Sequence, residues 1–362
     1  MPIDVDFTLA LNERTGKLFL GKDVISALGP RVSSVRYGRI KHMPSNGFLR
    51  RVAGRITHEE TKARVFRPAL VGPLPKIRDR NPVLHLDPLS VVRHRLAPQD
   101  IVLCHDIGPV THPAQFAPGV KELYVHAFAL IERTGPHMVF VSRTSQDEFH
   151  AHYGTAFASS TVIYNPTRSG IGAGAERRPA GLRAPFLLTV GNIGDRKNQL
   201  RCVEAFARAG LAGQGWQYVL TGGPEPGFEA VAALAARTQG VVMPGYVDDE
   251  QLRWLYRNAS GFVLMSLLEG FGMPVVEAAS HGLMCLVSQG GILREIGGPA
   301  VMDADPLDPD AIARGMRQIA GMSEAERADR LARTQQHIRN FEPGPIMQQW
   351  RDLVDGIELR HD

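Results

Sequence analysis

The stretch GFVLMSLLEGFGMPVVEAASHG, residues 261–282, contains a strand, a loop and a helix in succession. GFVLM is a short apolar run typical of a buried strand, and Gly282 is a stop signal for the helix. Pro274 suits the first turn of that helix, because its missing N–H needs no partner there. Two acids, Glu269 and Glu277, have seven residues between them. We expect Glu269 in the loop and Glu277 in the first turn of the helix.

The same strand and helix pattern recurs through residues 185–342. PFLLTV (185–190) is an apolar run, and NQLRCVEAFARAG (198–210) has apolar residues at helical spacing and ends in a glycine. Five further pairs follow: QYVLTGG with GFEAVAALAARTQ, VVMPGYV with DDEQLRWLYRNA, GFVLM with PVVEAASHG, LMCLVSQ with GILREIGG, and AVMDAD with PDAIARGMRQIA. Six alternating pairs predict an α/β domain with a parallel, doubly wound sheet.

The first half is less regular but also predicts an α/β domain, over residues 1–167. Residues 168–184 are rich in Gly, Pro, Ala and Arg and are interpreted as a linker. Residues 343–362 contain an amphipathic helix that we expect to pack back onto the first half. The pattern leaves residues 38–80 unassigned. Expected strands of the first half are 4–11, 82–86, 100–106, 137–142 and 160–164, and expected helices are 21–29 and 120–133.

Composition narrows the class of protein. A chain of 362 residues that is 44% hydrophobic is long enough for two domains. Its three cysteines lie far apart and form no CxxC pair, which fits a reducing cytoplasm better than a disulfide framework. No apolar run approaches the roughly 18 residues of a membrane span, and the N-terminus lacks a secretory leader pattern. We therefore expect a cytoplasmic protein.

Charge is unevenly distributed. Residues 1–175 hold 22 Lys and Arg against 14 Asp and Glu, whereas the rest holds 19 against 23. Much of the basic excess lies between Arg31 and Arg80. Two interpretations stay open at this point: a solvated basic surface, or a surface that meets an anionic partner such as a membrane face.

An apolar stripe runs through this basic segment, formed by Phe48, Leu49, Val52, Ala53 and Ile56 at helical spacing. Arginines stand between its members, so the segment could lie in a bilayer interface on the inner face of the plasma membrane. We favour the alternative, in which the stripe docks on its own domain.

The loops after two predicted strands suggest the ligand. Ligands of parallel sheets bind beyond the carboxyl ends of the strands. Gly270 and Gly272 leave backbone N–H groups bare at a helix start, which attracts anions. Arg196 and Lys197 follow another strand and supply positive charge. Two carboxylates beside an anion site are tolerated if they accept hydrogen bonds from neutral hydroxyls. A molecule with central phosphates and a sugar at each end meets all these demands.

SLLEGFGMPVVEA (266–278), with VGNIGDRKN (190–198) upstream, resembles the donor domain of the retaining nucleotide-sugar glycosyltransferases of family four. The likeness covers roughly residues 185–320. It implies the GT-B fold, with two Rossmann-like domains facing a cleft. It also implies that Glu269 contacts the donor sugar, Glu277 the ribose and Lys197, helped by Arg196, the diphosphate. The rest of the implied donor site comprises Asn192, Tyr246, Val247, Ser266, Gly270, Phe271, Gly272, Met273 and Pro274.

This chain departs from the family pattern at one position of the second half, and it resembles the family more weakly in the first half. Many relatives have Gly-Arg where this chain has Gly191 and Asn192, and Arg196 is the candidate substitute. In the first half, HDIGPVTHP (105–113) is similar to a cleft-facing segment of the family. His105 would then touch the donor sugar or orient the acceptor hydroxyl, with Asp106 near the acceptor. The competing interpretation of His105 is a buried structural histidine.

The loop ERTGKLFLGKD (13–23) stands where relatives approach the donor phosphate with a glycine. We select Gly16 over Gly21 for that contact. DVD (4–6) and DAD (303–305) contain paired aspartates of the kind that bind metals elsewhere, but we expect neither a metal nor any other cofactor.

The function expected from the resemblance is transfer of a hexose, best assigned as mannose from GDP-mannose, to a lipid-linked or growing surface saccharide. Retention implies that the departing phosphate takes the acceptor proton, with Glu269 stabilising charge. Alternatives are a nucleotide-sugar epimerase or hydrolase and a non-catalytic nucleotide-sugar binding subunit. A nicotinamide oxidoreductase would need GxGxxG after a strand, which neither half contains. Nucleic acid is not an expected partner.

Overall fold

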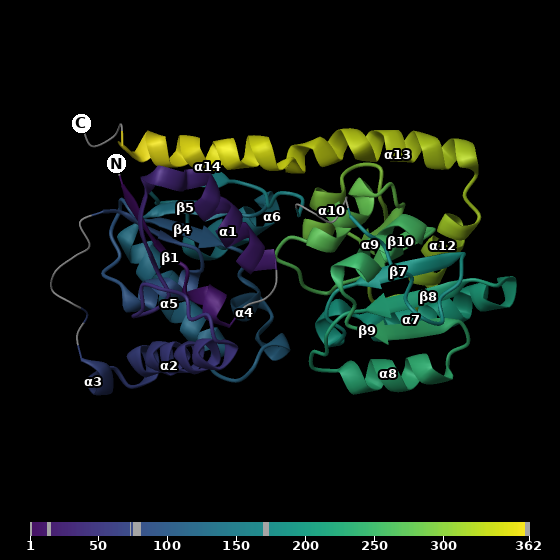
Figure 1. Ribbon diagram of the computed structural model, residues 1–362, viewed down its shortest axis with the longest axis horizontal. Coiled ribbons are helices and arrows are strands. Elements are labelled where there is room, and N and C mark those ends of the chain that lie inside the picture. The colour runs from purple at the N-terminus through teal and green to yellow at the C-terminus, as the bar shows by residue number, and fades with distance from the viewer. Residues whose placement is uncertain (1, 13–15, 73, 75–80, 169–173, 359–362) are drawn as a thin grey trace. The chain divides into compact units, whose positions relative to one another are not determined.

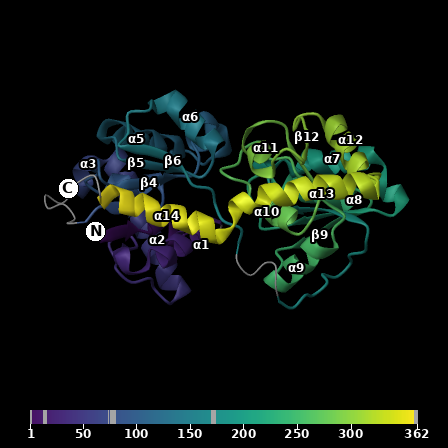
Figure 2. The same ribbon diagram turned by 90° about the horizontal axis from the view of Figure 1, so that it is seen from above.

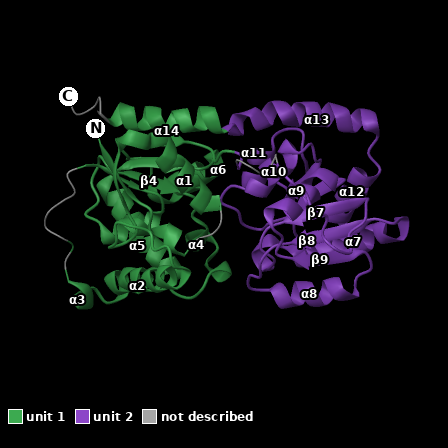
Figure 3. Cartoon of the chain, in the orientation of Figure 1, with its two compact units in different colours: residues 1–166, 343–362 green, residues 167–342 purple. Residues whose placement is uncertain are grey.

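The computed structural model describes residues 2–12, 16–72, 74, 81–168 and 174–358 (Figure 1). The chain divides into two compact units, drawn in different colours in Figure 3. Unit 1 comprises Met1–Pro166 together with Pro343–Asp362, and unit 2 comprises Thr167–Glu342. Among the described helices, none combines the length and the apolar character that crossing a membrane requires.

Unit 2 is built on a parallel sheet, as the alternating pattern predicted. Within the described residues it has six strands in the order β12-β11-β10-β7-β8-β9. The strands are β7 (Phe186–Val190), β8 (Gln217–Thr221), β9 (Val241–Gly245), β10 (Gly261–Leu264), β11 (Cys285–Ser288) and β12 (Met302–Ala304).

Helices cover both faces of this sheet (Figure 2). Alternate strand residues such as Leu187 and Val263 join α7, α8 and α12 in one buried cluster, and their neighbours Leu188 and Phe262 are buried as well. The helices are α7 (Gln199–Ala209), α8 (Phe228–Arg237), α9 (Asp249–Asn258), α10 (Met273–Ser280), α11 (Gly291–Gly297), α12 (Pro309–Ala320) and α13 (Glu324–Ile338). Short 3-10 helices are η5 (Asp195–Lys197), η6 (Leu211–Gln214) and η7 (Arg339–Phe341).

The strand order of unit 2 reverses between β7 and β10. These two strands are hydrogen-bonded neighbours, with Phe262 opposite Leu188, although β8 and β9 separate them in sequence. After β7 the chain leaves toward β8, and after β10 it leaves the other way toward β11. The two loops that follow these strands therefore diverge and leave a crevice at the carboxyl edge, where α/β sheets bind ligands.

Unit 1 has a second parallel sheet, in the order β2-β1-β3-β4-β5-β6 over the described part of the chain. Its strands are β1 (Ile3–Asp6), β2 (Val32–Arg36), β3 (Val83–His85), β4 (Ile101–Cys104), β5 (His137–Phe140) and β6 (Ser159–Val162). Its helices are α1 (Gly16–Leu28), α2 (Gly47–Phe66), α3 (Pro68–Val71), α4 (Gly108–Thr111), α5 (Val120–Thr134), α6 (Arg143–Tyr153) and α14 (Pro343–Glu358). Its 3-10 helices are η1 (Thr8–Leu11), η2 (Gly29–Arg31), η3 (Pro88–Arg93) and η4 (Pro113–Gln115).

Two boundaries predicted for unit 1 are wrong. The first strand was expected over 4–11, but β1 ends at Asp6 because the Asp6 carboxylate accepts a hydrogen bond from the Thr8 amide (3.0 Å) and turns the chain into η1. A loop was expected over 13–23 and a helix over 21–29, but the helix α1 already begins at Gly16 and ends at Leu28. Residues 13–15 lie outside the described residues. The sequence pattern did not predict β2, whose side chains are only half-buried.

The favoured interpretation of the apolar stripe is also wrong. Phe48, Val52 and Ile56 lie on α2, and their side chains are 63%, 40% and 63% exposed. The buried residues of α2 are small: Gly54, Thr57 and Thr61. A side chain at position 54 would collide with the Asn12 amide. The helix therefore packs on the rest of unit 1 through its small residues, and its large apolar side chains face solvent.

Two segments attach to the units by side-chain contacts. Asp355 on α14 makes a two-pronged ion pair with Arg31 (2.7 and 2.8 Å), within unit 1. In the stretch interpreted as a linker, Arg177 pairs with Asp248 and the Arg178 guanidinium lies 5.5 Å from the centre of the Trp254 ring, both within unit 2. Residues 169–173 lie outside the described residues.

Candidate functional site

The candidate site lies in unit 2, where the loops after β7 and β10 meet at the reversal of strand order. The Leu267 amide donates to the Arg196 carbonyl oxygen (2.9 Å), and the Arg196 guanidinium donates to the Leu268 carbonyl oxygen (3.2 Å). Backbone hydrogen bonding thus joins two loops that are about 70 residues apart in sequence. The predicted basic and acidic segments are neighbours in space.

A buried ion pair stands at the centre of this junction. The Lys197 ammonium donates to the Glu269 carboxylate, and each side chain is only 9% exposed. The Ser266 hydroxyl also donates to Glu269 (2.8 Å), and Arg196 lies 4.0 Å from its second oxygen. Burial by itself would raise the pKa of Glu269, but the charges of Lys197 and Arg196 outweigh burial and hold that pKa below its usual value. Glu269 is therefore a carboxylate at neutral pH.

Arg196 has a partner that the sequence analysis missed. Its guanidinium contacts both oxygens of Glu225 (3.0 and 3.2 Å), and the Asn192 amide donates to the same carboxylate (2.9 Å). Glu225 lies in the loop between β8 and α8, and no motif in that loop marked it in advance. The charges of Arg196, Lys197, Glu225 and Glu269 sum to zero, so neither cation stands uncompensated.

Of the two glycines in the turn before α10, Gly272 has a positive φ and Gly270 does not. Gly272 is the N-cap of α10 and has a φ of 95°, and a side chain there would lie 2.5 Å from Leu293. Met273 begins the helix and Pro274 lies in its first turn, as predicted. Phe271 is buried and packs edge-on against Phe341, with ring centres 5.7 Å apart. The turn is therefore anchored on its apolar side, and Gly270 lies beside Glu269 on the loop.

Glu277 lies in the second turn of α10 and not in the first, because the helix begins at Met273. Its carboxylate accepts a hydrogen bond from the buried Tyr256 hydroxyl (2.8 Å). Burial raises the pKa of Glu277 to about 7, although the Tyr256 hydrogen bond and the charge of Arg168 act in the opposite direction. Tyr256 and Arg168 are two further residues that sequence reasoning missed. Glu277 therefore changes its protonation state near neutral pH.

The remaining predicted residues of unit 2 follow β9, the edge strand beside β8. Tyr246 is 85% exposed, whereas Val247 is buried. An exposed aromatic ring at the carboxyl edge of a parallel sheet is available for stacking on a planar ligand.

The predicted residues of unit 1 do not form a comparable cluster. His105 is buried, and its Nε2 lies 3.1 Å from the Leu86 carbonyl oxygen, which can only accept, so Nε2 bears the proton. Burial, with the charge of Lys17, holds the pKa of His105 well below its usual value, which makes the ring neutral. Asp106 accepts a hydrogen bond from the Gly108 amide (2.9 Å) at the start of α4. Gly16 begins α1, and Gly21 lies against the Phe7 ring and has a packing role.

The paired aspartates have protein partners. Asp4 accepts from the Ser34 hydroxyl (2.7 Å), and Asp6 is paired with His94 (2.7 Å). Asp303 pairs with Arg294 (3.2 Å) and Asp305 accepts from the Leu307 amide (2.8 Å). In the described ranges there is no group of three or more His, Cys, Asp or Glu side chains that could hold a metal ion.

Breaking the Lys197–Glu269 pair should destabilise unit 2, because the remaining partner becomes an uncompensated buried charge. We expect Lys197→Met and Glu269→Gln each to lower the free energy of unfolding by about 3–5 kcal/mol, and the double variant to lose much less than the sum. Equilibrium urea unfolding followed by tryptophan fluorescence measures this. The matched control is Arg208→Gln, which breaks the ion pair of Arg208 with Asp310 (3.0 Å), whose side chains are about half exposed. This variant should lower the free energy of unfolding by under about 0.5 kcal/mol. Additive losses would contradict the pairing.

Comparison with known proteins agrees with this architecture. Residues 175–337 match the family model described as glycosyl transferases group 1. The O-antigen chain mannosyltransferase B of Escherichia coli is 46% identical over 74 residues, which are 20% of this chain and 19% of that protein. The serotype-specific mannosyltransferase WbdA of Escherichia coli is 28% identical over 238 residues, which are 60% of this chain and 29% of that protein. The chain thus spans less than a third of the length of these relatives.

Solved structures show the fold over the whole chain. Sucrose-phosphate synthase from Thermosynechococcus elongatus superposes with a TM-score of 0.69 at 17% identity, covering 99% of this chain and 100% of that one. HepE from Anabaena, solved in complex with UDP and glucose, superposes with a TM-score of 0.68 at 16% identity, covering 98% and 100%. The two six-stranded parallel sheets are those of the GT-B fold, and residues 175–337 form a domain of the glycosyl transferases group 1 family.

Proposed function

We propose that the protein is a retaining hexosyltransferase that moves mannose from GDP-mannose to a lipid-linked or growing cell-surface saccharide, as in polysaccharide or lipopolysaccharide biosynthesis. One observation carries the proposal: the Lys197–Glu269 pair lies between the loops of β7 and β10 within a glycosyl transferases group 1 domain. Mannose is favoured because the two curated relatives above are mannosyltransferases. A UDP-sugar is the main rival donor, since HepE was solved with UDP and glucose.

Each charged group of the site is proposed to contact a different part of the donor. An ammonium has three donors and Glu269 takes one, so Lys197 can also hold a diphosphate oxygen. The first turn of α10 presents further N–H groups to the diphosphate. Glu269, ionised and held by Lys197 and Ser266, accepts hydrogen bonds from sugar hydroxyls. Arg196 is held by Glu225 and contributes its remaining donors, in place of the family's usual Gly-Arg cation.

In the proposed reaction, the bond between the anomeric carbon and the diphosphate oxygen breaks. The acceptor oxygen bonds to the anomeric carbon on the same face of the sugar from which the diphosphate departs. The acceptor proton passes to the departing phosphate oxygen, so no protein base is required. Negative charge grows on the diphosphate as the bond breaks, and fixed donors stabilise that transition state most. We assign Glu269 to sugar positioning and charge stabilisation, because Lys197 and Ser266 already occupy its Oε1. The reaction as proposed uses no metal or other cofactor.

A donor panel tests the site directly. The full chain is mixed with GDP-mannose, UDP-glucose and other purified nucleotide sugars, and thermal shift is scored before slow hydrolysis of each donor. We expect GDP-mannose to raise the melting temperature most. Lys197→Ala should lower kcat/KM for donor hydrolysis by about a hundredfold or more, because it removes a transition-state cation. The assignment of this site to a nucleotide-sugar donor is wrong if no nucleotide diphosphate sugar raises the melting temperature of the protein.

The same panel separates the competing functions. Glu269→Ala should abolish turnover while nucleotide binding persists, and retained turnover would argue against the role given to Glu269. A non-catalytic binding subunit would show binding without turnover in the unmodified chain. Accumulation of an epimerised donor or of free sugar, with no product in the presence of any saccharide acceptor, would favour the epimerase or hydrolase alternative.

The pKa of Glu277 makes donor binding depend on pH. Only the carboxylate can accept two ribose hydroxyls at once, and with a pKa of about 7 it is mostly protonated at pH 6 and mostly ionised at pH 8. We expect the Kd for GDP-mannose, whose diphosphate does not titrate in this range, to fall by up to about tenfold from pH 6 to pH 8. Calorimetric titration measures it.

Glu277→Gln is the control for this pH effect and should flatten the dependence. The variant should also weaken GDP-mannose more than it weakens inorganic pyrophosphate, which has no ribose. An unchanged pH profile, or equal losses for the two ligands, would contradict the ribose role of Glu277.

We also propose that the protein works as a peripheral protein on the inner face of the plasma membrane, with α2 as the contact. Phe48, Leu49, Val52 and Ile56 are exposed on one helix together with Arg51 and Arg55, which suits an anionic interface. Phe48→Ser with Ile56→Ser should weaken the partition constant for vesicles of phosphatidylglycerol and phosphatidylcholine, measured by co-sedimentation, by about thirtyfold, since each exposed apolar side chain contributes about 1 kcal/mol and 1.4 kcal/mol is tenfold. Leu307→Ser, exposed in unit 2, is the matched control. Equal sedimentation of all variants would exclude α2 as the contact.

A further inference from the structure

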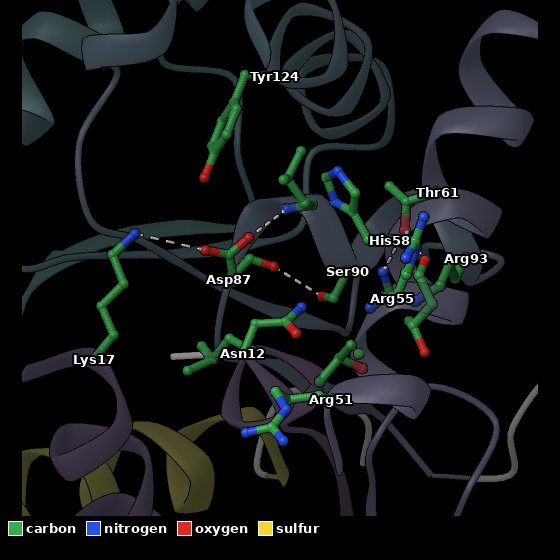
Figure 4. Close-up of a pocket in the computed structure, with 15 residues that line it drawn as sticks. Asn12, Lys17, Arg51, Arg55, His58, Thr61, Asp87, Ser90, Arg93 and Tyr124 are labelled. Carbon is green, nitrogen blue, oxygen red and sulfur yellow. Dashed lines mark hydrogen bonds and ion pairs between the residues drawn. The ribbon is translucent and has the colours of Figure 1, made fainter. Parts of the chain in front are cut away.

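A cavity in unit 1 has no part in the donor chemistry described above. It has a volume of about 550 Å³, within the roughly 300–1,000 Å³ of ligand pockets. Thr8, Leu9 and Asn12, which follow β1, and Asp87, Leu89 and Ser90, which follow β3, line one part of it, and α2 supplies the other (Figure 4). In the order β2-β1-β3-β4, the strand order of this parallel sheet reverses between β1 and β3. The cavity therefore occupies the place where unit 1 is built to bind a ligand.

The lining of this cavity is strongly basic. Four of its described lining residues are cationic, namely Lys17, Arg51, Arg55 and Arg93, against one acid, Asp87. His58 adds a further polar nitrogen. A concave wall with this balance attracts an anion and raises its local concentration.

Two of these cations, Arg93 and Lys17, already have acidic partners. Arg93 is 8% exposed, donates to the Thr61 hydroxyl (2.8 Å) and lies 3.5 Å from the buried Asp6. Lys17 lies 3.8 Å from Asp87, as the dashed line in Figure 4 marks. These paired groups would present little net charge to a ligand.

The cations on α2 differ, because within the described part of the chain Arg51 and Arg55 have no acidic partner. The two acids of α2 pair elsewhere: Glu59 with Lys62, and Glu60 with Arg39 and Arg64. Arg51, Arg55 and His58 succeed one another at spacings of four and three, so they share one face of the helix. Like charges so placed repel each other, and a bound anion would relieve that repulsion.

Backbone packing holds this face over the cavity. A Cβ at Gly54 would lie 2.0 Å from the Asn12 side chain, and a Cβ at Gly38 would lie 2.7 Å from the Thr57 hydroxyl. Gly54, Thr57 and Thr61 of α2 are all buried within unit 1. The helix is therefore seated closely, and its arginines extend from a rigid base, which lowers the entropic cost of binding.

We propose that this cavity binds the phosphate group of a phosphorylated saccharide, held by Arg51, Arg55 and His58. Guanidinium groups match phosphate geometry in pairs of parallel hydrogen bonds. Asp87, Ser90 and the hydroxyl of Tyr124 line the same space and offer partners for sugar hydroxyls. Identification of this saccharide as the acceptor rests on the proposed function, whereas binding of the phosphate does not.

Two sources can supply this chemistry: a water-soluble sugar phosphate, or a sugar joined to a lipid through phosphate. Calorimetric titration of the full chain with inorganic phosphate and glucose 6-phosphate, with glucose as the uncharged control, tests the first. Vesicles of phosphatidylcholine with and without undecaprenyl phosphate test the second. We expect at least one phosphate probe to bind at least tenfold more tightly than its phosphate-free counterpart, and the probe that binds identifies the source.

Arg51→Gln with Arg55→Gln should weaken that binding at least tenfold. The matched control is Arg67→Gln, which removes an exposed arginine at the end of α2 that does not line the cavity, and should leave binding unchanged. Both arginines of the double variant are exposed, so it should melt at the temperature of the unmodified chain. The proposal is overturned if no phosphate probe binds, or if the double variant binds as the unmodified chain does.

Failure of this site and failure of the donor site are distinguishable in one set of variants. The double variant should keep the full thermal shift with GDP-mannose, because the residues that carry the proposed donor site, Lys197, Glu269 and Glu277, belong to unit 2. Phosphate binding that depends on Arg51 and Arg55, in a chain that binds no nucleotide sugar, would support the cavity and sink the proposed function. A thermal shift with nucleotide sugars, without phosphate binding in the cavity, would do the reverse.

Discussion

The buried pair of Lys197 and Glu269 is the constraint on which the candidate site depends. Two charges taken out of water are tolerable only with each other and with further hydrogen bonds, and here Ser266 and Arg196 complete the set. The pair also joins the loops of β7 and β10, so the geometry of the site is coupled to its electrostatics. A ligand that engages Lys197 must share the ammonium with Glu269, which favours a ligand carrying both a phosphate and hydroxyl groups.

Both units apply the same physical rule to different chemistry. Each sheet reverses its chain order between two adjacent parallel strands, β7 and β10 in unit 2 and β1 and β3 in unit 1. The loops there diverge and leave space at the carboxyl edge. In unit 2 the space is bounded by charges that sum to zero. In unit 1 it is lined by two arginines of α2, Arg51 and Arg55, that have no acidic partner among the described residues. The contrast in charge, more than in fold, distinguishes what the two units are suited to bind.

Misplaced predictions share a cause, which is that local patterns do not reveal tertiary partners. The stripe on α2 has helical spacing, yet the small face of Gly54, Thr57 and Thr61 is the one that packs, because close approach to Asn12 excludes larger side chains. The strand expected over 4–11 ends early because Asp6 hydrogen-bonds the backbone two residues on. The role of His105 stays a prediction, and the structure adds that its Nε2 lies 3.1 Å from the Leu86 carbonyl oxygen.

The sequence by itself determined the class of the fold and the main members of the candidate site. Short continuous apolar runs that alternate with apolar residues at helical spacing specify parallel strands and crossover helices. The Gly272 turn and Pro274 are local signals that need no tertiary context. The tertiary structure alone decided the partners: Glu225 for Arg196, Tyr256 for Glu277, and the cavity beneath α2. These contacts join residues far apart in the chain. Their energies depend on burial and distance, which a linear pattern of residues does not encode.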